Sequence, residues 1–256
     1  MSIQEKHSSK VCLLNIIAFI TAYYISVLCH EWGHGLVAWL YGLKSSPFSV
    51  HYGGWFLLNV DENVDYNLLF QQDSGTAAAL IGIAGPFVSL VILLISLWTI
   101  NRKNISQQRN LFIFAYWFLV FNMLPLIQYL TVSLFAIQGD TNRFVEGLSI
   151  SRWWVFIPGT IFNIYMIQRI MRIEIIKAYL IMPIKERMYR NIMLFFTLFV
   201  MFWFIYAGGF NPLSAEGLMP LSRYLAIFSI ALVPILFIVC NPMRDWVKKR
   251  MVKNLT

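Results

Sequence analysis

Two histidines and a glutamate stand within the apolar run SVLCHEWGHGLVAWL, which covers residues 26–40. His30 and His34 are four residues apart, so on a helix both imidazoles project from one face, one turn apart. Glu31 is rotated from them but stays close enough to reach a water bound at the same place. This H-E-x-x-H pattern supplies two metal ligands and a general base. It predicts a metal-activated water that attacks a carbonyl, with Glu31 taking the proton.

Two plainer interpretations of these residues are polar packing within a helix bundle and a metal-free proton relay. A charged group at membrane depth costs about 2.5 kcal/mol or more. Three ionisable groups in one apolar run therefore favour an ion-binding site over simple packing. We expect the ion to be Zn²⁺, because H-E-x-x-H on a helix is a zinc-binding pattern.

A catalytic zinc usually has three protein ligands and one open position. We expect Asp140 to be the third ligand, because it follows the third apolar run on the side of the membrane that His30 also approaches. A helix cap or a loop charge is the plain alternative for Asp140. Other candidates for the third ligand are His51, Glu146 and the acidic stretch 61–65, and a site without a third ligand also stays open.

Long apolar blocks must position these groups. The chain is 59% hydrophobic and 12% charged, whereas soluble domains carry about 25% charged residues. The sequence therefore predicts an all-α polytopic membrane protein. We count six membrane spans, of which the fourth and fifth are either short spans or re-entrant segments. They cover residues 11–41, 76–100, 111–137, 153–168, 192–207 and 221–240.

The net charge of +8 does not indicate a nucleic-acid partner, because the basic residues lie between apolar blocks and act as topology signals. With the N-terminus inside, all but four of the 20 Lys and Arg residues are cytoplasmic. The first span has no small-residue cleavage site and is expected to be retained. We expect an integral multi-pass protein in the lipid bilayer, in the cell or inner membrane if bacterial, with both termini cytoplasmic.

Two connections between spans carry structural signals. In residues 45–66, apolar residues alternate with polar ones before Gly53-Gly54, and a second apolar run follows. This pattern predicts a β-hairpin whose edge could pair with an extended peptide, although an amphipathic loop on the lipid surface fits equally. Residues 172–190 are basic and amphipathic and are interrupted by Pro183, which predicts an interfacial helix on the cytoplasmic face.

Three segments together resemble the site-2 protease family of intramembrane zinc metalloproteases: HEWGHGLVAW in the first span, GIAGPFVSL (82–90) in the second and FNMLPL (121–126) in the third. The resemblance covers about the first 145 residues. It implies a core of three helices that holds zinc within the membrane and hydrolyses a peptide bond in or near a transmembrane segment. It implies the following roles: zinc ligation by His30, His34 and Asp140, general base catalysis by Glu31, and substrate or oxyanion support by Ser89, Asn122, Gly85 and Pro86.

The chain departs from the family pattern at two positions. Three residues after Pro86, where the family usually has asparagine, this chain has Ser89, whose hydroxyl can still donate a hydrogen bond. The aspartate usually follows the Asn-x-x-Pro element closely and precedes glycine. Here Asp140 comes 15 residues after Pro125 and precedes Thr141, or about 22 Å along a straight helix. Either the outer end of the third span presents Asp140, or another residue is the ligand.

We therefore expect residues 1–145 to form a catalytic core with the zinc motif and the hairpin, and residues 146–256 to add three spans and the basic segment to the same membrane domain. The expected activity is zinc-dependent endoproteolysis of a membrane protein or peptide. One alternative is an inactive membrane metalloprotein that acts as a chaperone or regulator. Another is a prenyl-protein-type metallopeptidase, which is disfavoured because four downstream glutamates lack an aspartate four residues on: Glu146, Glu174, Glu186 and Glu216.

Overall fold

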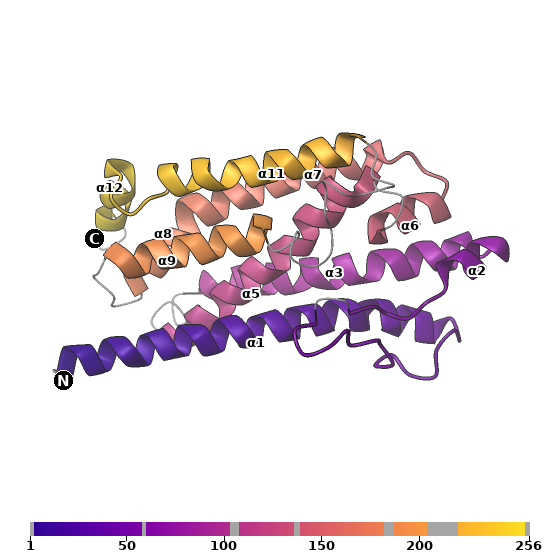
Figure 1. Cartoon of the computed structure of the whole chain (residues 1–256), viewed down its shortest axis with the longest axis horizontal. Coiled ribbons are helices and arrows are strands. Elements are labelled where there is room, and N and C mark those ends of the chain that lie inside the picture. The colour runs from indigo at the N-terminus through magenta and orange to yellow at the C-terminus, as the bar shows by residue number, and fades with distance from the viewer. Residues whose placement is uncertain are drawn as a thin grey trace.

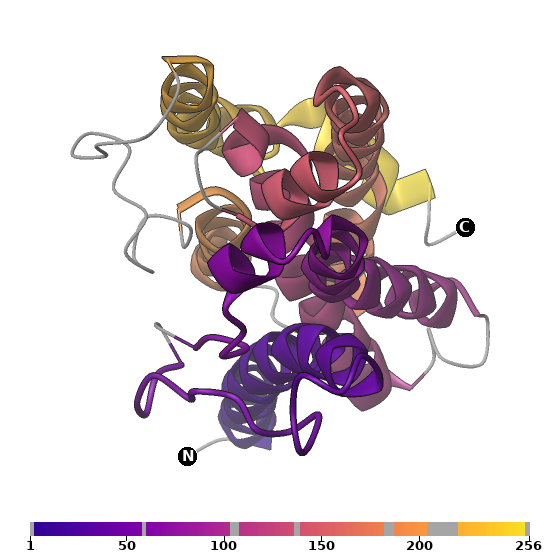
Figure 2. The ribbon, with the colours of Figure 1, turned by 90° about the vertical axis from the view of Figure 1, so that its right-hand side faces the viewer.

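The computed structural model describes residues 3–57, 60–102, 108–135, 139–181, 187–203 and 220–253, which form a bundle of helices (Figure 1). The start of α1 and the short α12 lie at one end of the bundle, and α2 and α6 lie at the other. Figure 2 looks onto that second end. The α-helices are α1 (Ile3–Leu40), α2 (Tyr66–Gln71), α3 (Gly75–Ile100), α5 (Arg109–Ile127), α6 (Asp140–Gly147), α7 (Trp153–Arg169), α8 (Ile175–Ile181), α9 (Arg187–Leu198), α11 (Pro220–Val239) and α12 (Asp245–Lys253).

Four helical segments in the described part of the chain are long and apolar enough to cross a membrane: Lys10–Leu40, Gly75–Ile100, Arg109–Phe135 and Leu221–Val239. They correspond to the first, second, third and sixth predicted spans. The last residues of the predicted third span, 136–137, lie outside the described residues. The expectation of a mostly helical chain with helices that are long and apolar enough to span a membrane is thus confirmed for these segments.

The count of six spans is not confirmed. The predicted fourth span forms α7, but the helix continues through a π-helical turn, Ile170–Glu174, into α8. This continuation carries charged groups, and the segment is not apolar enough over a membrane-spanning length. The predicted fifth span is helical from its start to Trp203, in α9 and a π-helical turn, and residues 204–207 lie outside the described residues. The apolar helix that overlaps the start of this span, Met188–Phe202, is shorter than the four long segments.

The predicted β-hairpin between the first two spans is not confirmed either. Among the described residues of this connection, a single antiparallel bridge joins His51 to Asp61, through backbone N···O distances of 2.8 and 2.9 Å. Gly53 and Gly54 do adopt positive φ, as the predicted turn requires. The hydroxyls of Tyr23 and Tyr24 on α1 bind backbone carbonyls of the loop beyond the turn. These bonds hold the segment against α1 and give two of its backbone carbonyls a partner other than a second strand.

Helices α1, α3 and α5 pack against one another and form the framework of the bundle. Small residues on α1 permit the close contacts. A Cβ on Gly33 would lie 3.0 Å from the Ala84 carbonyl oxygen of α3, and one on Gly35 would lie 2.2 Å from the carbonyl oxygen of Pro47 in the loop. Gly33 and Gly35 therefore allow the neighbouring backbones to approach α1 closely.

The chain returns toward α1 after α5. Helix α5 ends in a π-helical turn, Gln128–Val132, and a 3₁₀ turn, Ser133–Phe135. Gly139, with φ of 148°, then forms the N-cap directly before α6. Helix α6 packs on α3 where both backbones come close, at Gly75 against Gly147 and at Gly82 against Asp140. A straight extension of α5 is thus avoided, and the first residue of α6 is directed to the α1–α3 interface.

Candidate metal centre

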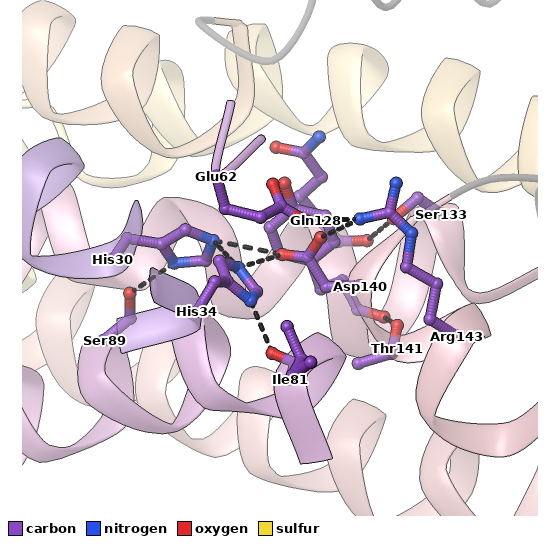
Figure 3. A network of polar contacts seen from close by, with 11 residues as sticks. His30, His34, Glu62, Ile81, Ser89, Gln128, Ser133, Asp140, Thr141 and Arg143 are labelled. Atoms are coloured by element: carbon purple, nitrogen blue, oxygen red, sulfur yellow. Dashed lines mark hydrogen bonds and ion pairs between the residues drawn. The ribbon is translucent and has the colours of Figure 1, made fainter. Parts of the chain in front are cut away.

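Three groups that can ligate a metal converge where α1, α3 and α6 meet (Figure 3). His30 Nε2 lies 3.1 Å and His34 Nε2 lies 3.2 Å from Asp140 Oδ2, and the two Nε2 atoms are 3.3 Å apart. All three residues are buried. The expected His30–His34–Asp140 group is therefore present, in a geometry that could hold a metal ion.

The other imidazole nitrogen of each histidine has its own partner. His34 Nδ1 lies 2.6 Å from the carbonyl oxygen of Ile81, and His30 Nδ1 lies 3.0 Å from Ser89 Oγ. Because a carbonyl oxygen can only accept, Nδ1 of His34 carries a proton. A neutral His34 then turns the lone pair of Nε2 toward Asp140. Second partners of this kind fix the tautomer and ring orientation of metal-binding histidines.

The carboxyl group of Asp140 is charged in this setting. Burial by itself raises the pKa of Asp140, but the charge of a protonated His34 and hydrogen bonds from both imidazoles outweigh burial and hold the pKa below its usual range. In a neutral His34, whose proton lies on Nδ1, Nε2 and Asp140 Oδ2 are instead two facing acceptors. They repel unless a cation, either a proton or a metal ion, lies between them.

Gly85 of α3 leaves the space in front of the two imidazoles free. A Cβ at this position would lie 2.1 Å from His34 Nε2 and 2.7 Å from His30 Nε2, closer than side chains approach in proteins. The adjacent Pro86 is buried within α3 and lacks the N–H that would complete the helix at that turn. Of the predicted Gly85-Pro86 pair, Gly85 thus borders the nitrogen atoms directly.

Replacing Gly85 by alanine should abolish metal binding without weakening α3. The new methyl group would occupy the space beside both Nε2 atoms, while alanine is the better helix former by about 1 kcal/mol. Metal content of the purified variant, measured by elemental analysis, checks this. Gly159→Ala is the matched control, since its Cβ would meet Leu130 at 2.8 Å, away from the three ligands. Equal metal content in both variants would contradict the assignment.

Glu31 is the next residue on α1 after His30 and is 9% exposed. Its carboxylate is near enough to His34 to interact with it electrostatically. It is not one of the three converging groups. This placement is compatible with a base that lies beside the ligands.

Two predicted support residues have contacts that indicate a positioning role. Ser89 is fully buried and its hydroxyl lies on His30 Nδ1, on the side of the ring away from Asp140. Asn122 of α5 donates from Nδ2 to Ser26 Oγ at 2.8 Å and to the Phe118 carbonyl at 2.9 Å. Ser26 precedes His30 by one helical turn, so this hydrogen bond links α5 to α1 one turn before the first histidine.

The alternative third ligands have other roles in the described structure. His51 is exposed and forms the backbone bridge to Asp61. Glu146 is exposed and pairs with Arg152 at 3.1 Å. Within the acidic stretch, Asp65 caps α2 by accepting from the Leu68 N–H.

Three further residues lie at this centre, and sequence patterns predict no supporting role for them. Glu62 is buried and pairs with Arg143 of α6 at 2.7 Å. The Tyr129 ring, in the π-helical turn after α5, stacks on His30 with centroids 5.5 Å apart. Glu62 belongs to the acidic stretch 61–65, which the sequence indicates only as a source of ligands, and Arg143 lies three residues after Asp140, a spacing that brings two side chains together on a helix.

The chain matches no family model, no curated protein and no solved structure. Its function therefore has to be inferred from the residues and their arrangement.

Proposed function

We propose that the chain is a zinc-dependent endopeptidase of the site-2 protease type, which hydrolyses a peptide bond in or near a transmembrane segment of a membrane protein. The observation that carries the proposal is the convergence of His30, His34 and Asp140 beside a buried glutamate in an H-E-x-x-H helix. This convergence supports the resemblance at the position where the sequence departs most from the family pattern. Asp140 lies close to the histidines although it comes 15 residues after Pro125.

The spacing of the three donor atoms supports zinc as the ion. Zinc bonds to nitrogen and carboxylate oxygen are about 2.0–2.2 Å, so ligand atoms at tetrahedral angles are about 3.3 Å apart. The observed separations are 3.1, 3.2 and 3.3 Å. Two imidazoles and one carboxylate are also a donor set of catalytic zinc sites, which keep one position open. A zinc ion there would polarise a peptide carbonyl and lower the pKa of a water molecule.

The chain's own residues would transfer the proton, orient the ligands and leave space for the reacting atoms. Glu31 would accept the proton of the attacking water and later donate it to the leaving amine. Ser89 and Ile81 hold the imidazoles in orientation. Gly85 leaves room for the reacting atoms in front of the rings.

The position of the histidines supports cleavage within the membrane. His30 lies in the apolar segment Lys10–Leu40, about 30 Å along the helix from Lys10 and about 15 Å from Leu40. If the N-terminus is cytoplasmic, as the distribution of basic residues indicates, the centre lies in the outer half of the bilayer. We propose a multi-pass protein with both termini in the cytoplasm.

The proposal is tested with the full chain purified in detergent and loaded with one equivalent of zinc. We expect cleavage of single-span membrane peptides from a sequence-varied set, with cuts in or near the apolar segment. A chelator should suppress the cleavage, and stoichiometric zinc should restore it. Cleavage that persists at full rate in the metal-free protein would contradict a zinc mechanism. A zinc-loaded protein that cuts no peptide would favour the non-enzymatic alternative.

A further inference from the structure

A buried ion pair links the connection before α2 to the helix that carries Asp140. Arg143 Nη1 lies 2.7 Å from Glu62 Oε1, and the Glu62 side chain is 6% exposed. Glu62 belongs to the connection between α1 and α2, whereas Arg143 lies on α6, three residues after Asp140. Figure 3 shows both side chains beside the Asp140 carboxylate.

The guanidinium of Arg143 is held on more than one side. Its central carbon lies 3.6 Å from the centroid of the Tyr66 ring, in a cation–π contact with the first residue of α2. Its Nη1 atom also lies 3.9 Å from Asp140 Oδ1. Burial lowers the pKa of Arg143, but the negative charge of Glu62 and Asp140 outweighs burial and raises it, so the group stays charged.

The two oxygens of Asp140 therefore have different neighbours. Oδ2 contacts His30 Nε2 and His34 Nε2, and Oδ1 faces Arg143. A carboxylate that binds a metal through one oxygen is commonly oriented by a partner on the other. Glu62 is close enough to act electrostatically on both histidines as well, and its ion pair with Arg143 offsets part of its charge.

We infer that Arg143, clamped by Glu62 and Tyr66, is a positioning residue that orients Asp140 for metal binding and so couples the connection before α2 to the metal centre. The inference rests on the proposed zinc centre. On this inference, the connection between α1 and α2 also influences metal binding. Displacement of Glu62, for example by an entering substrate strand, would weaken the hold on Asp140, the third ligand.

The test measures zinc affinity by competition with a chromogenic chelator, for the full chain in detergent. We expect Arg143→Gln and Glu62→Gln each to raise the zinc dissociation constant by about 10–100-fold, as changes in the partners of metal ligands do. The double variant should bind zinc as well as the single variant with the larger loss does, because the two residues act as one unit and their effects do not add.

The matched controls are Glu146→Gln and Arg152→Gln. This pair joins the same helix α6 to the residue before α7 at 3.1 Å, but Glu146 is 46% exposed and does not face the ligands. Both controls should bind zinc like the unaltered chain. Gel filtration and far-UV circular dichroism report whether each variant folds. If Arg143→Gln does not fold, Arg143→Lys replaces it, with a smaller expected loss because the charge is kept.

A charge swap distinguishes two possible roles of the Glu62–Arg143 pair: orienting Asp140, or merely tethering the loop to α6. The double variant Glu62→Arg/Arg143→Glu would restore a tether between the loop and α6. It would not restore the orientation of Asp140, because a carboxylate at position 143 would repel Asp140 Oδ1. Restored zinc affinity in the swap, or unchanged affinity in the single variants, overturns the inference. If Asp140→Ala itself binds zinc as tightly as the unaltered chain, the proposed metal centre has failed instead.

Discussion

Replacing Asp140 by alanine is expected to empty the metal centre while the helical bundle stays folded. Asp140 supplies the one carboxylate oxygen among the three converging donors, at 3.1 and 3.2 Å from the histidine nitrogens. Two imidazoles alone leave zinc short of the three protein ligands that catalytic sites use. The loss of affinity should therefore exceed the about 10–100-fold effect of changing a ligand's partner.

The measurement is zinc per chain by elemental analysis after gel filtration in detergent. Asp245→Ala is the matched control, because Asp245 also begins a short helix, α12, but is exposed. We expect the control to keep about one zinc per chain, as one three-ligand site predicts. If Asp140→Ala keeps its zinc, the contacts of Asp140 with the histidines are ion pairs only, and another residue is the third ligand.

Replacing Glu31 by glutamine should abolish turnover but leave zinc in place. Glutamine has nearly the same size, but it cannot accept the proton of an attacking water. General acid–base catalysis contributes about 10²–10⁴-fold to the rate, which sets the expected loss. Glu31 is buried beside the ligands and is not one of them, so zinc content should match that of the unaltered chain.

The test compares the rate of peptide cleavage and the zinc content of the same preparation. Glu146→Gln is the control, since Glu146 is half-exposed and paired with Arg152. Full turnover by Glu31→Gln would rule out Glu31 as the base. Loss of both zinc and turnover would indicate a structural role, because an isosteric neutral side chain should not disturb the ligands.

These two results also separate the remaining functional alternatives. A chaperone or regulator that binds metal would lose zinc in Asp140→Ala and show no turnover to lose in Glu31→Gln. A prenyl-protein-type peptidase would require a downstream glutamate ligand. Glu174, one candidate, is fully buried but forms ion pairs with Arg169 and Lys177 at 3.3 and 3.0 Å.

The sequence predicted the parts of the site that depend on local geometry. Helical periodicity alone places His30 and His34 on one face, and an unbroken apolar run alone makes a long helix in a membrane chain. The first, second, third and sixth predicted spans are accordingly found as long apolar helices. The predicted fourth span is not among them, and its helix continues into a charged stretch.

The predicted hairpin shows where a local pattern is insufficient. Alternation of apolar and polar residues in 45–66 fits a strand, but a strand needs a partner for its backbone groups. In this chain the hydroxyls of Tyr23 and Tyr24 bind part of that backbone, and only His51 and Asp61 form a bridge among the described residues. The competing partners lie on α1, far away in sequence, so no window of the sequence contains them.

By itself, the sequence determined two imidazoles on one helical face, a glutamate beside them and the apolar helices that carry them. Only the tertiary structure decided that Asp140 completes the group, because the π-helical and 3₁₀ turns after α5 redirect the chain and α6 packs on α3 at Gly82. It also placed Ser89 beside His30 and Glu62 beside Arg143, because both contacts join segments far apart in the sequence. The physical reason is that helix periodicity is set within a few residues, whereas the donors of this centre come from segments more than 100 residues apart.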